Sequence, residues 1–316
     1  MVNIISLFPG QGAQYEKMGL DLYDRYDEVK RLFALAGDVS DFDVHHLLSE
    51  GSLEEITATE KAQVLITLVN LSAAKVLKMK GISVGATAGF SLGELTSYAV
   101  AGVIDDEQLF RLVARRGALM GHHGGEAAKR FGALSMAAVI GLSFDRVQEI
   151  IGSSSVEHLY AANDNGPAQV VISGLAASME TVTPALKAAG ARRVIPIQVS
   201  GPFHTPLMQE ARQEFDADLE VERFNDPSIA LYSNVSGDVV DSGARVKELC
   251  SQQIVSPVRW TKIMNHLASD YSGVPVVESG PNKVLGGLLR AVGVKCLQAG
   301  TVESLESTIK EVQADE

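Results

Sequence analysis

The segment Gly89-Phe90-Ser91-Leu92-Gly93 carries the spacing G-x-S-x-G between an apolar run, residues 84–88, and a helix-like stretch, residues 94–100. Between a strand and a helix this spacing is typical of a nucleophile elbow, which presents a serine hydroxyl at the edge of a sheet. Glycines permit so sharp a turn, because a side chain would clash there. The backbone N–H of Leu92 would face a developing oxyanion. A Gly/Ser turn without chemistry fits the same five residues, since short motifs produce false positives.

A serine nucleophile needs a base, and one of the seven histidines differs in its setting from the others. His204 lies where a predicted strand ends in Gly201-Pro202 and a helix begins at about Thr205. Ligand sites in open α/β sheets lie at the carboxyl ends of strands, so His204 has the same kind of setting as Ser91. For one histidine considered alone, a structural or surface role is the alternative.

Composition narrows the class of protein. The chain has 316 residues, is 46% hydrophobic and 21% charged, and has no uninterrupted apolar stretch long enough to span a membrane. The first eight residues read as a strand and not as a signal peptide, which predicts a cytoplasmic protein without membrane association. Cys250 and Cys296 suggest neither a disulfide framework nor a metal site. The net charge of −12 argues against nucleic-acid binding and requires a local basic patch for any acidic partner.

The elements that must position Ser91 and His204 follow from the periodicity. A glycine-rich loop, residues 9–12, follows the first strand, and a long amphipathic helix begins at Thr59 or Glu60 and stops at Gly81. Acids at 105–107 begin another helix, which continues to 120. After residue 200 the pattern predicts helices over 205–219, 245–253 and 284–292, and strands over 229–233 and 274–278.

A different order occupies the middle of the chain. Residues 122–130 are polar and read as a linker. The predicted elements that follow are a strand over 133–140, a helix over 143–151, strands over 158–162 and 169–174 around a turn at 163–167, a helix over 176–189 and a strand over 193–199. This β-α-β-β-α-β order is ferredoxin-like. The sequence therefore predicts an α/β fold: a large hydrolase-like domain with a parallel sheet and the elbow (residues 1–128 and 200–316), and an inserted ferredoxin-like domain (residues 129–199).

Six motifs, in order, resemble the malonyl-CoA:acyl carrier protein transacylases of fatty-acid synthesis and the related acyltransferases of polyketide synthesis. They are Phe8-Pro9-Gly10-Gln11-Gly12-Ala13-Gln14, the elbow through Glu94, Arg115-Arg116-Gly117 with Met120, residues 201–208, Ser256-Pro257-Val258-Arg259-Trp260 and Glu278-Ser279-Gly280-Pro281. The resemblance extends from Ile4 to about Gly300. The inserted ferredoxin-like domain is also a feature of that family.

The resemblance implies a Ser-His dyad. Ser91 takes malonyl from the CoA thioester as an ester, and His204 accepts the serine proton and later returns it to the departing thiol. The family orients its histidine through a backbone carbonyl near Gln253, so no third carboxylate is expected. The backbone N–H groups of Gln11 and Leu92 would form the oxyanion hole. An ordinary Pro-Gly turn is the alternative reading of the loop around Gln11.

The resemblance also implies a substrate pocket. Arg116 would pair with the free malonyl carboxylate through two parallel hydrogen bonds, and its charge would separate malonyl from acetyl. Arg115 and Arg111 are alternatives, as solvated charges on the same helix. Gln253 would support the arginine or the substrate, with its neighbour Gln252 as a competing assignment.

Three further positions bear on the choice of substrate. Phe203 is expected to exclude methyl-branched units by overlap, and core packing is its alternative role. Asn163 matches a family asparagine near the substrate, although turn asparagines are common for local reasons. Phe90 departs from the family, which most often has histidine before the serine, so it leaves both a polar contact there and the choice of extender unit open.

The resulting prediction is a ping-pong acyltransferase that moves malonyl from malonyl-CoA to the phosphopantetheine thiol of a holo acyl carrier protein and needs no metal or other cofactor. A hydrolase of the same architecture and a catalytically silent scaffold subunit are the alternatives, and the sequence leaves fatty-acid and polyketide pathways both open. Because carrier proteins are acidic, docking is expected at local basic residues. The candidates are Arg192, Arg193, Lys283 and Arg290.

Overall fold

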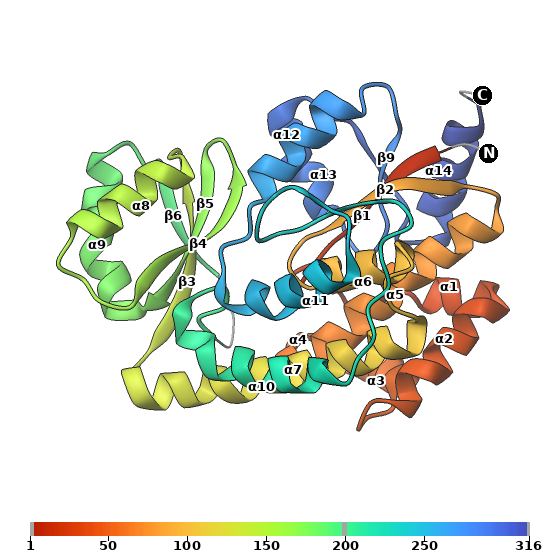
Figure 1. The fold of residues 1–316 in the computed structure, drawn as a ribbon, viewed down its shortest axis with the longest axis horizontal. Coiled ribbons are helices and arrows are strands. Elements are labelled where there is room, and N and C mark those ends of the chain that lie inside the picture. Colours follow the sequence, from red (N-terminus) through yellow and green to blue (C-terminus); the bar gives the residue numbers. More distant parts are fainter. Residues whose placement is uncertain (1–2, 198–200, 315–316) are drawn as a thin grey trace.

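The larger sheet of the protein has six strands and is mostly parallel. A computed structural model describes residues 3–197 and 201–314 (Figure 1). The strand order is β10-β9-β1-β2-β7-β8, in which only the β7–β8 pair is antiparallel. The strands are β1 (Asn3–Phe8), β2 (Ser83–Gly89), β7 (Ala230–Tyr232), β8 (Val239–Val240), β9 (Val276–Glu278) and β10 (Cys296–Gln298). The predicted parallel sheet in an α/β fold is confirmed.

Helices cover both faces of this sheet, as a parallel sheet requires. Alternation along β1 illustrates why: Ile5 and Leu7 pack with α12 (Trp260–Asp270) and α13 (Val284–Leu289), whereas Ile4 packs in the cluster that holds α5 (Thr59–Met79). By length and composition α5 could span a membrane, but 83% of its most apolar 18-residue stretch is buried inside the protein. This burial marks α5 as the central core helix.

The remaining helices outside residues 134–197 surround the larger sheet and α5. They are α1 (Leu20–Arg25), α2 (Asp27–Asp38), α3 (Val44–Glu50), α4 (Leu53–Thr57), α6 (Gly93–Val100), α7 (Asp106–Phe131), α10 (Gln209–Glu220), α11 (Gly243–Gln252) and α14 (Val302–Ala314), with 3₁₀ turns η1 (Pro206–Met208), η2 (Gln253–Val255) and η3 (Arg290–Val292).

The second sheet, with its two helices, lies to one side of the molecule in Figure 1. Its antiparallel strands run in the order β4-β5-β3-β6. The elements are β3 (Leu134–Ile140), α8 (Phe144–Ser153), β4 (Leu159–Gly166), β5 (Gln169–Leu175), α9 (Ala176–Ala188) and β6 (Arg193–Ile197). Val139, Ile172 and Leu186 belong to a core of its own. The end of the predicted strand at 198–199 and the expected boundary between 199 and 200 lie outside the described residues.

The predicted linker over 122–130 is wrong, because α7 continues through it to Phe131. The segment is amphipathic: His123, Gly124 and Ala127 are buried on one face, while Lys129 pairs with Glu126 at the surface. Its polar composition is that of a half-exposed helix, and the helix ends at Gly132 with a φ of 101°. The expected boundary between residues 128 and 129 therefore falls inside α7.

The predicted start of the turn at residue 163 is also wrong, because β4 extends to Gly166. The extension has a partner on its other side: the Asp164 N–H donates to the Val258 carbonyl at 2.8 Å, and the Val258 N–H donates to the Ala162 carbonyl at 2.9 Å. This pairing with a distant segment outweighs the turn propensity of the Asn-Asp-Asn sequence. It also joins the small sheet to the rest of the molecule beside Asn163.

Candidate active site

The serine lies in a left-handed turn between β2 and α6. Ser91 has a φ of 50°, a backbone conformation that non-glycine residues rarely adopt. The glycines on either side allow two chain segments to approach: a Cβ at Gly89 would overlap the backbone of Gly93, and a Cβ at Gly93 would overlap the carbonyl of Phe8. The turn is therefore pressed against the end of β1, and Ser91 is presented at the carboxyl edge of the sheet.

His204 meets this serine from the loop before η1. Its Nε2 lies 2.7 Å from the Ser91 Oγ, and its Nδ1 lies 2.9 Å from the backbone carbonyl oxygen of Gln253. A carbonyl oxygen only accepts, so Nδ1 carries the proton and Nε2 accepts from the serine hydroxyl. Burial, followed by the nearby positive charge of Arg116, lowers the pKa of His204 to about 4. The imidazole is thus neutral at physiological pH and can take a proton.

The loop that carries Gln11 lies directly against the elbow. A Cβ at Gly10 would overlap the Phe90 carbonyl oxygen and would lie 3.5 Å from the Leu92 nitrogen. The loop is fastened to α5, because Asn70 Nδ2 donates to the Pro9 carbonyl at 3.0 Å and Gln11 Nε2 donates to Thr59 Oγ1 at 3.2 Å. Gln11 and Leu92 both line the cavity in front of Ser91.

Arg116 is buried in the same cavity, with 1% of its surface exposed. Its two terminal nitrogens donate to the side-chain oxygens of Gln63 and Gln253, each at 2.8 Å, and its Nε has no hydrogen-bond partner among the described residues. Burial lowers its pKa to about 10, so it remains a cation at neutral pH. Within residues 3–197 and 201–314 no carboxylate lies at ion-pair distance from it, so it can accept a ligand carboxylate.

The alternatives to these assignments lie elsewhere. Arg111 and Arg115 are on the outer face of α7, where they pair with Glu222 and Asp218. Gln253, at the start of η2, makes the contact with Arg116, whereas its neighbour Gln252 is only half-buried.

The cavity has a volume of about 270 Å³ and a mostly apolar wall. Phe90 and Phe203 both line it, and Phe90 packs edge-on against Trp260 with ring centroids 5.4 Å apart. Asn163 is buried in the wall at the end of β4. Further apolar residues come from three strands of the small sheet and from helices α7 and α13: Met120, Met136, Val171, Ile197, Val284 and Leu288. The structure thus brings together every site residue that the sequence indicated.

Sequence reasoning missed Asn234, which follows β7. Its Oδ1 accepts from the Ser91 N–H at 2.6 Å, its Nδ2 donates to the Gly89 carbonyl at 2.7 Å, and its own N–H donates to Glu94 Oε1 at 3.1 Å. The available signal was its position just beyond the predicted strand over 229–233, at the carboxyl edge of the sheet. Gln63 was missed as well, because it lies within a long apolar helix.

Comparison with known proteins identifies the class. A family model described as an acyl transferase domain matches residues 6–290. Two curated relatives are named malonyl CoA-acyl carrier protein transacylase: that of Bacillus subtilis (strain 168) is 34% identical and aligns over 100% of this chain and 99% of its own length, and that of Haemophilus influenzae is 34% identical over 97% of each chain.

Solved structures agree. The chain matches a complex described as a type II PKS acyl-carrier protein with its malonyl-transacylase, with a TM-score of 0.90, 31% identity, and coverage of 98% of this chain and 99% of that one. It also matches an acyl carrier protein S-malonyltransferase from Vibrio cholerae, with a TM-score of 0.88, 33% identity, and coverage of 96% and 99%. The protein is therefore an acyltransferase. Its chain belongs to the malonyl CoA-acyl carrier protein transacylase family.

Proposed function

We propose that the protein transfers malonyl from malonyl-CoA to the phosphopantetheine thiol of an acyl carrier protein through a malonyl ester on Ser91. The observation that carries this proposal is the 2.7 Å contact between Ser91 Oγ and His204 Nε2 in a cavity that also holds Arg116, a cation with no carboxylate of the described residues at ion-pair distance. A hydroxyl with a neutral base accounts for acyl transfer, and a buried guanidinium accounts for an acyl group with a free carboxylate.

The first half-reaction follows from this geometry. Ser91 Oγ attacks the thioester carbonyl while His204 Nε2 takes its proton, and the oxyanion forms beside the backbone N–H groups of Gln11 and Leu92. The C–S bond then breaks, and the imidazolium returns the proton to the CoA sulfur. In the second half-reaction the carrier thiol attacks the ester, His204 takes the thiol proton, and Ser91 Oγ leaves with that proton.

The wall of the cavity is proposed to select the acyl group. Arg116, supported by Gln253, binds the malonyl carboxylate. Phe203, beside His204, excludes an added methyl at the α-carbon by overlap, and Asn163 borders the substrate from the small sheet. Phe90 faces the cavity from the elbow and packs on Trp260, so it supplies an apolar surface next to Ser91.

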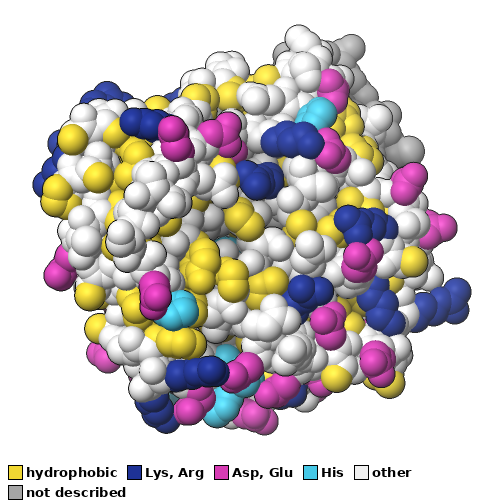
Figure 2. Space-filling view, turned by 60° about the vertical axis from the view of Figure 1, so that its left-hand side comes forward, with side chains coloured by type: hydrophobic (Ala, Val, Ile, Leu, Met, Phe, Trp, Pro, Cys, Tyr) yellow, Lys and Arg dark blue, Asp and Glu magenta, His cyan; other side chains and the backbone are white. Residues whose placement is uncertain are grey.

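The carrier protein is proposed to dock at basic residues near the mouth of the cavity. Arg192, Arg193, Lys283 and Arg290 are exposed. Lys283 adjoins Val284, and β6 carries Ile197 after Arg193; both Val284 and Ile197 line the cavity. In the view of Figure 2, hydrophobic side chains gather near the centre of the face, with charged side chains spread around them. An acidic partner needs such local cations, since the net charge of −12 repels it.

At the level of the fold, we infer a hydrolase-like large domain (residues 1–128 and 200–316) and an inserted ferredoxin-like domain (residues 129–199). The elbow between β2 and α6 supports the first assignment. The order β3-α8-β4-β5-α9-β6, with a separate core, supports the second. The position of α7 argues for moving the first boundary to Gly132. The cytoplasmic location stays a prediction from the sequence.

The test is mass spectrometry of the protein after exposure to malonyl-CoA, with and without holo carrier protein. We expect a malonyl adduct on the peptide that contains Ser91, no adduct in Ser91→Ala, and discharge of the adduct to the carrier. Malonate release without the carrier as the main product would support a hydrolase instead. Absence of any adduct in the wild type would support a silent subunit.

A further inference from the structure

We propose that Asn234 is a positioning residue that holds Ser91 in the orientation required for attack; this inference rests on the proposed role of Ser91 as the nucleophile. One side-chain amide connects both ends of the elbow. Its oxygen accepts from the Ser91 N–H at 2.6 Å, and its nitrogen donates to the Gly89 carbonyl at 2.7 Å. Asn234 is fully buried, so water does not compete for these two hydrogen bonds.

The backbone of the elbow needs such hydrogen bonds to keep its conformation. Ser91 has a φ of 50°, and a non-glycine residue keeps this conformation only where its surroundings enforce it. The Ser91 carbonyl is held as well, by Gln253 Nε2 at 3.0 Å. Asn234 thus holds the N–H of the serine and Gln253 holds its carbonyl. Rotation of either peptide would carry Oγ away from His204 Nε2.

Glu94 is hydrogen-bonded to both Asn234 and Gln253, the two residues that hold the backbone of Ser91. One of its carboxylate oxygens accepts from the Asn234 backbone N–H at 3.1 Å, and the other accepts from Gln253 Nε2. Gln253 also accepts from Arg116 at 2.8 Å and, through its backbone, from His204. The nucleophile, the base and the carboxylate-binding cation are therefore all connected by hydrogen bonds, through Asn234 or Gln253, to the buried Glu94 on α6. Glu94 lies three residues after the serine.

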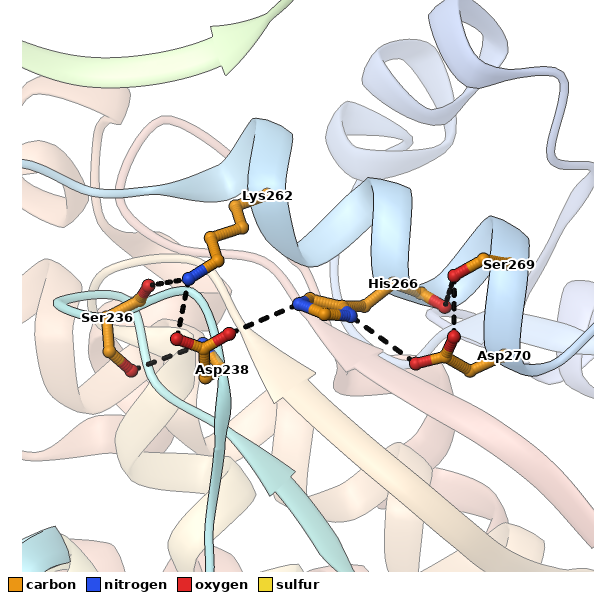
Figure 3. A network of polar contacts seen from close by, with 6 residues as sticks. All are labelled: Ser236, Asp238, Lys262, His266, Ser269 and Asp270. Carbon is orange, nitrogen blue, oxygen red and sulfur yellow. Dashed lines mark hydrogen bonds and ion pairs between the residues drawn. The ribbon is translucent and has the colours of Figure 1, made fainter.

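Asn234 is itself fixed by the hairpin between β7 and β8. Its carbonyl accepts from the Arg259 N–H at 2.8 Å. Figure 3 shows how side chains of α12 reach the outer side of the hairpin: Lys262 Nζ lies 3.0 Å from the Ser236 carbonyl oxygen and 2.6 Å from Asp238, and His266 Nε2 lies 3.2 Å from Asp238. These groups attach the turn to α12 and leave the amide of Asn234 directed at the elbow.

The experiment measures formation of the malonyl-Ser91 ester in a single turnover by rapid quench, over a range of malonyl-CoA concentrations. Asn234→Ala removes both bonds, and we expect the limiting rate to fall about 100-fold, as for a nucleophile displaced by about 1 Å. We expect the half-saturating malonyl-CoA concentration to change less than about threefold, because Arg116 and the cavity wall remain. Asn234→Asp keeps an acceptor for the Ser91 N–H but sets a carboxylate oxygen against the Gly89 carbonyl oxygen in place of the donor, so its rate should also fall.

Asp238→Asn is the matched control. It weakens the attachment of the same hairpin to Lys262 and His266 but leaves both bonds of Asn234, and its rate should stay within about threefold of wild type, since exposed ion pairs contribute little. A limiting rate for Asn234→Ala within threefold of wild type would overturn the proposal. An equal fall in Asp238→Asn would also overturn it, because the effect would then belong to hairpin stability.

Two further outcomes are separated by the design. If Asn234→Ala does not fold, Asn234→Asp against Asp238→Asn decides by the same criterion. If the wild type forms no ester on Ser91, the proposed function fails. An ester in the wild type with an unchanged rate in the Asn234 variants overturns only the positioning role.

Discussion

At the scale of single residues, the chemistry depends on two buried cationic or basic groups that share one environment. His204 and Arg116 are both buried, and the charge of Arg116 helps to keep the imidazole neutral. Gln253 contacts both, through its carbonyl and its side chain. Arg116, which we propose binds the substrate carboxylate, therefore also lowers the pKa of the base.

This coupling predicts the pH dependence of ester formation. Burial and then Arg116 lower the pKa of His204 from 6.5 to about 4, so the fall in rate that comes from protonation of His204 should lie near pH 4 and not near pH 6.5. Burial raises the pKa of Glu94 to about 7. Any change in the rate that comes from titration of Glu94 should therefore lie about three pH units above the change that comes from His204.

In Arg116→Ala the step assigned to His204 should move to higher pH, because the repelling charge is gone while the burial remains. The pH profile of the rapid-quench rate measures both steps. A wild-type profile without a step near pH 4 would contradict the depressed pKa of His204.

Arg116 also predicts substrate selection. Arg116→Ala should lower the preference for malonyl-CoA over acetyl-CoA by at least about tenfold, because a charged hydrogen-bonded pair is lost. Arg116→Lys should not restore it, since lysine lacks the planar fork. Arg115→Ala, on the exposed side of α7, is the control and should keep the wild-type ratio of kcat/KM values. Unchanged discrimination in Arg116→Ala would refute the carboxylate clamp.

At the scale of elements, the elbow depends on close backbone approach. A Cβ at Gly93 would overlap the Phe8 carbonyl, which belongs to β1 and cannot move aside without disturbing the sheet. Around Gly125, within α7, no described atom beyond its chain neighbours and its own helix backbone lies within 4 Å of a hypothetical Cβ.

The two glycines therefore predict opposite effects on stability. Gly93→Ala should lower the free energy of unfolding by about 1–3 kcal/mol or more through overpacking. Gly125→Ala should raise it by about 0.5–1 kcal/mol through helix propensity. Denaturant unfolding of both variants gives the comparison. A Gly93→Ala protein as stable as wild type would show that β1 and α6 are free to separate.

Most helices and strands could be predicted because their periodicity is local. The start of α5 at Thr59 and the elbow after β2 are visible in a few consecutive residues. The two errors have a common cause. The helical segment over 122–130 and the extension of β4 through Asn163 both have partners far along the chain, Glu214 for His123 and Val258 for Asp164. No local pattern contains those partners.

At the scale of the whole molecule, the distribution of charge limits where the second substrate, the carrier protein, can approach. The chain carries a net charge of −12, and an acidic carrier protein approaches it only where cations are concentrated. Arg192, Arg193, Lys283 and Arg290 are exposed, with Lys283 and β6 next to residues of the cavity wall.

Charge reversal at these four positions should raise the KM for the carrier protein and weaken its dependence on salt. The rate of malonyl transfer from malonyl-CoA to Ser91 should stay unchanged, because that step does not involve the carrier. Arg245→Glu, on α11, is the control and should affect neither half-reaction. If the quadruple variant accepts the carrier as well as wild type does, the docking surface is elsewhere.

The sequence by itself indicated the class of chemistry and most of the candidate groups: Ser91, His204, Arg116 and Gln11 stand in motifs that are short and continuous in the chain, and Gln253 lies just before another. What the tertiary structure decided is how these motifs are held. Asn234 in the β7–β8 hairpin accepts from the Ser91 N–H and donates its own N–H to Glu94 on α6, and Gln63 on α5 accepts from Arg116 on α7. The physical reason is that nucleophilic and basic side chains are specified by their own identity, whereas a buried hydrogen bond is specified by the distance between segments that only the folded chain brings together.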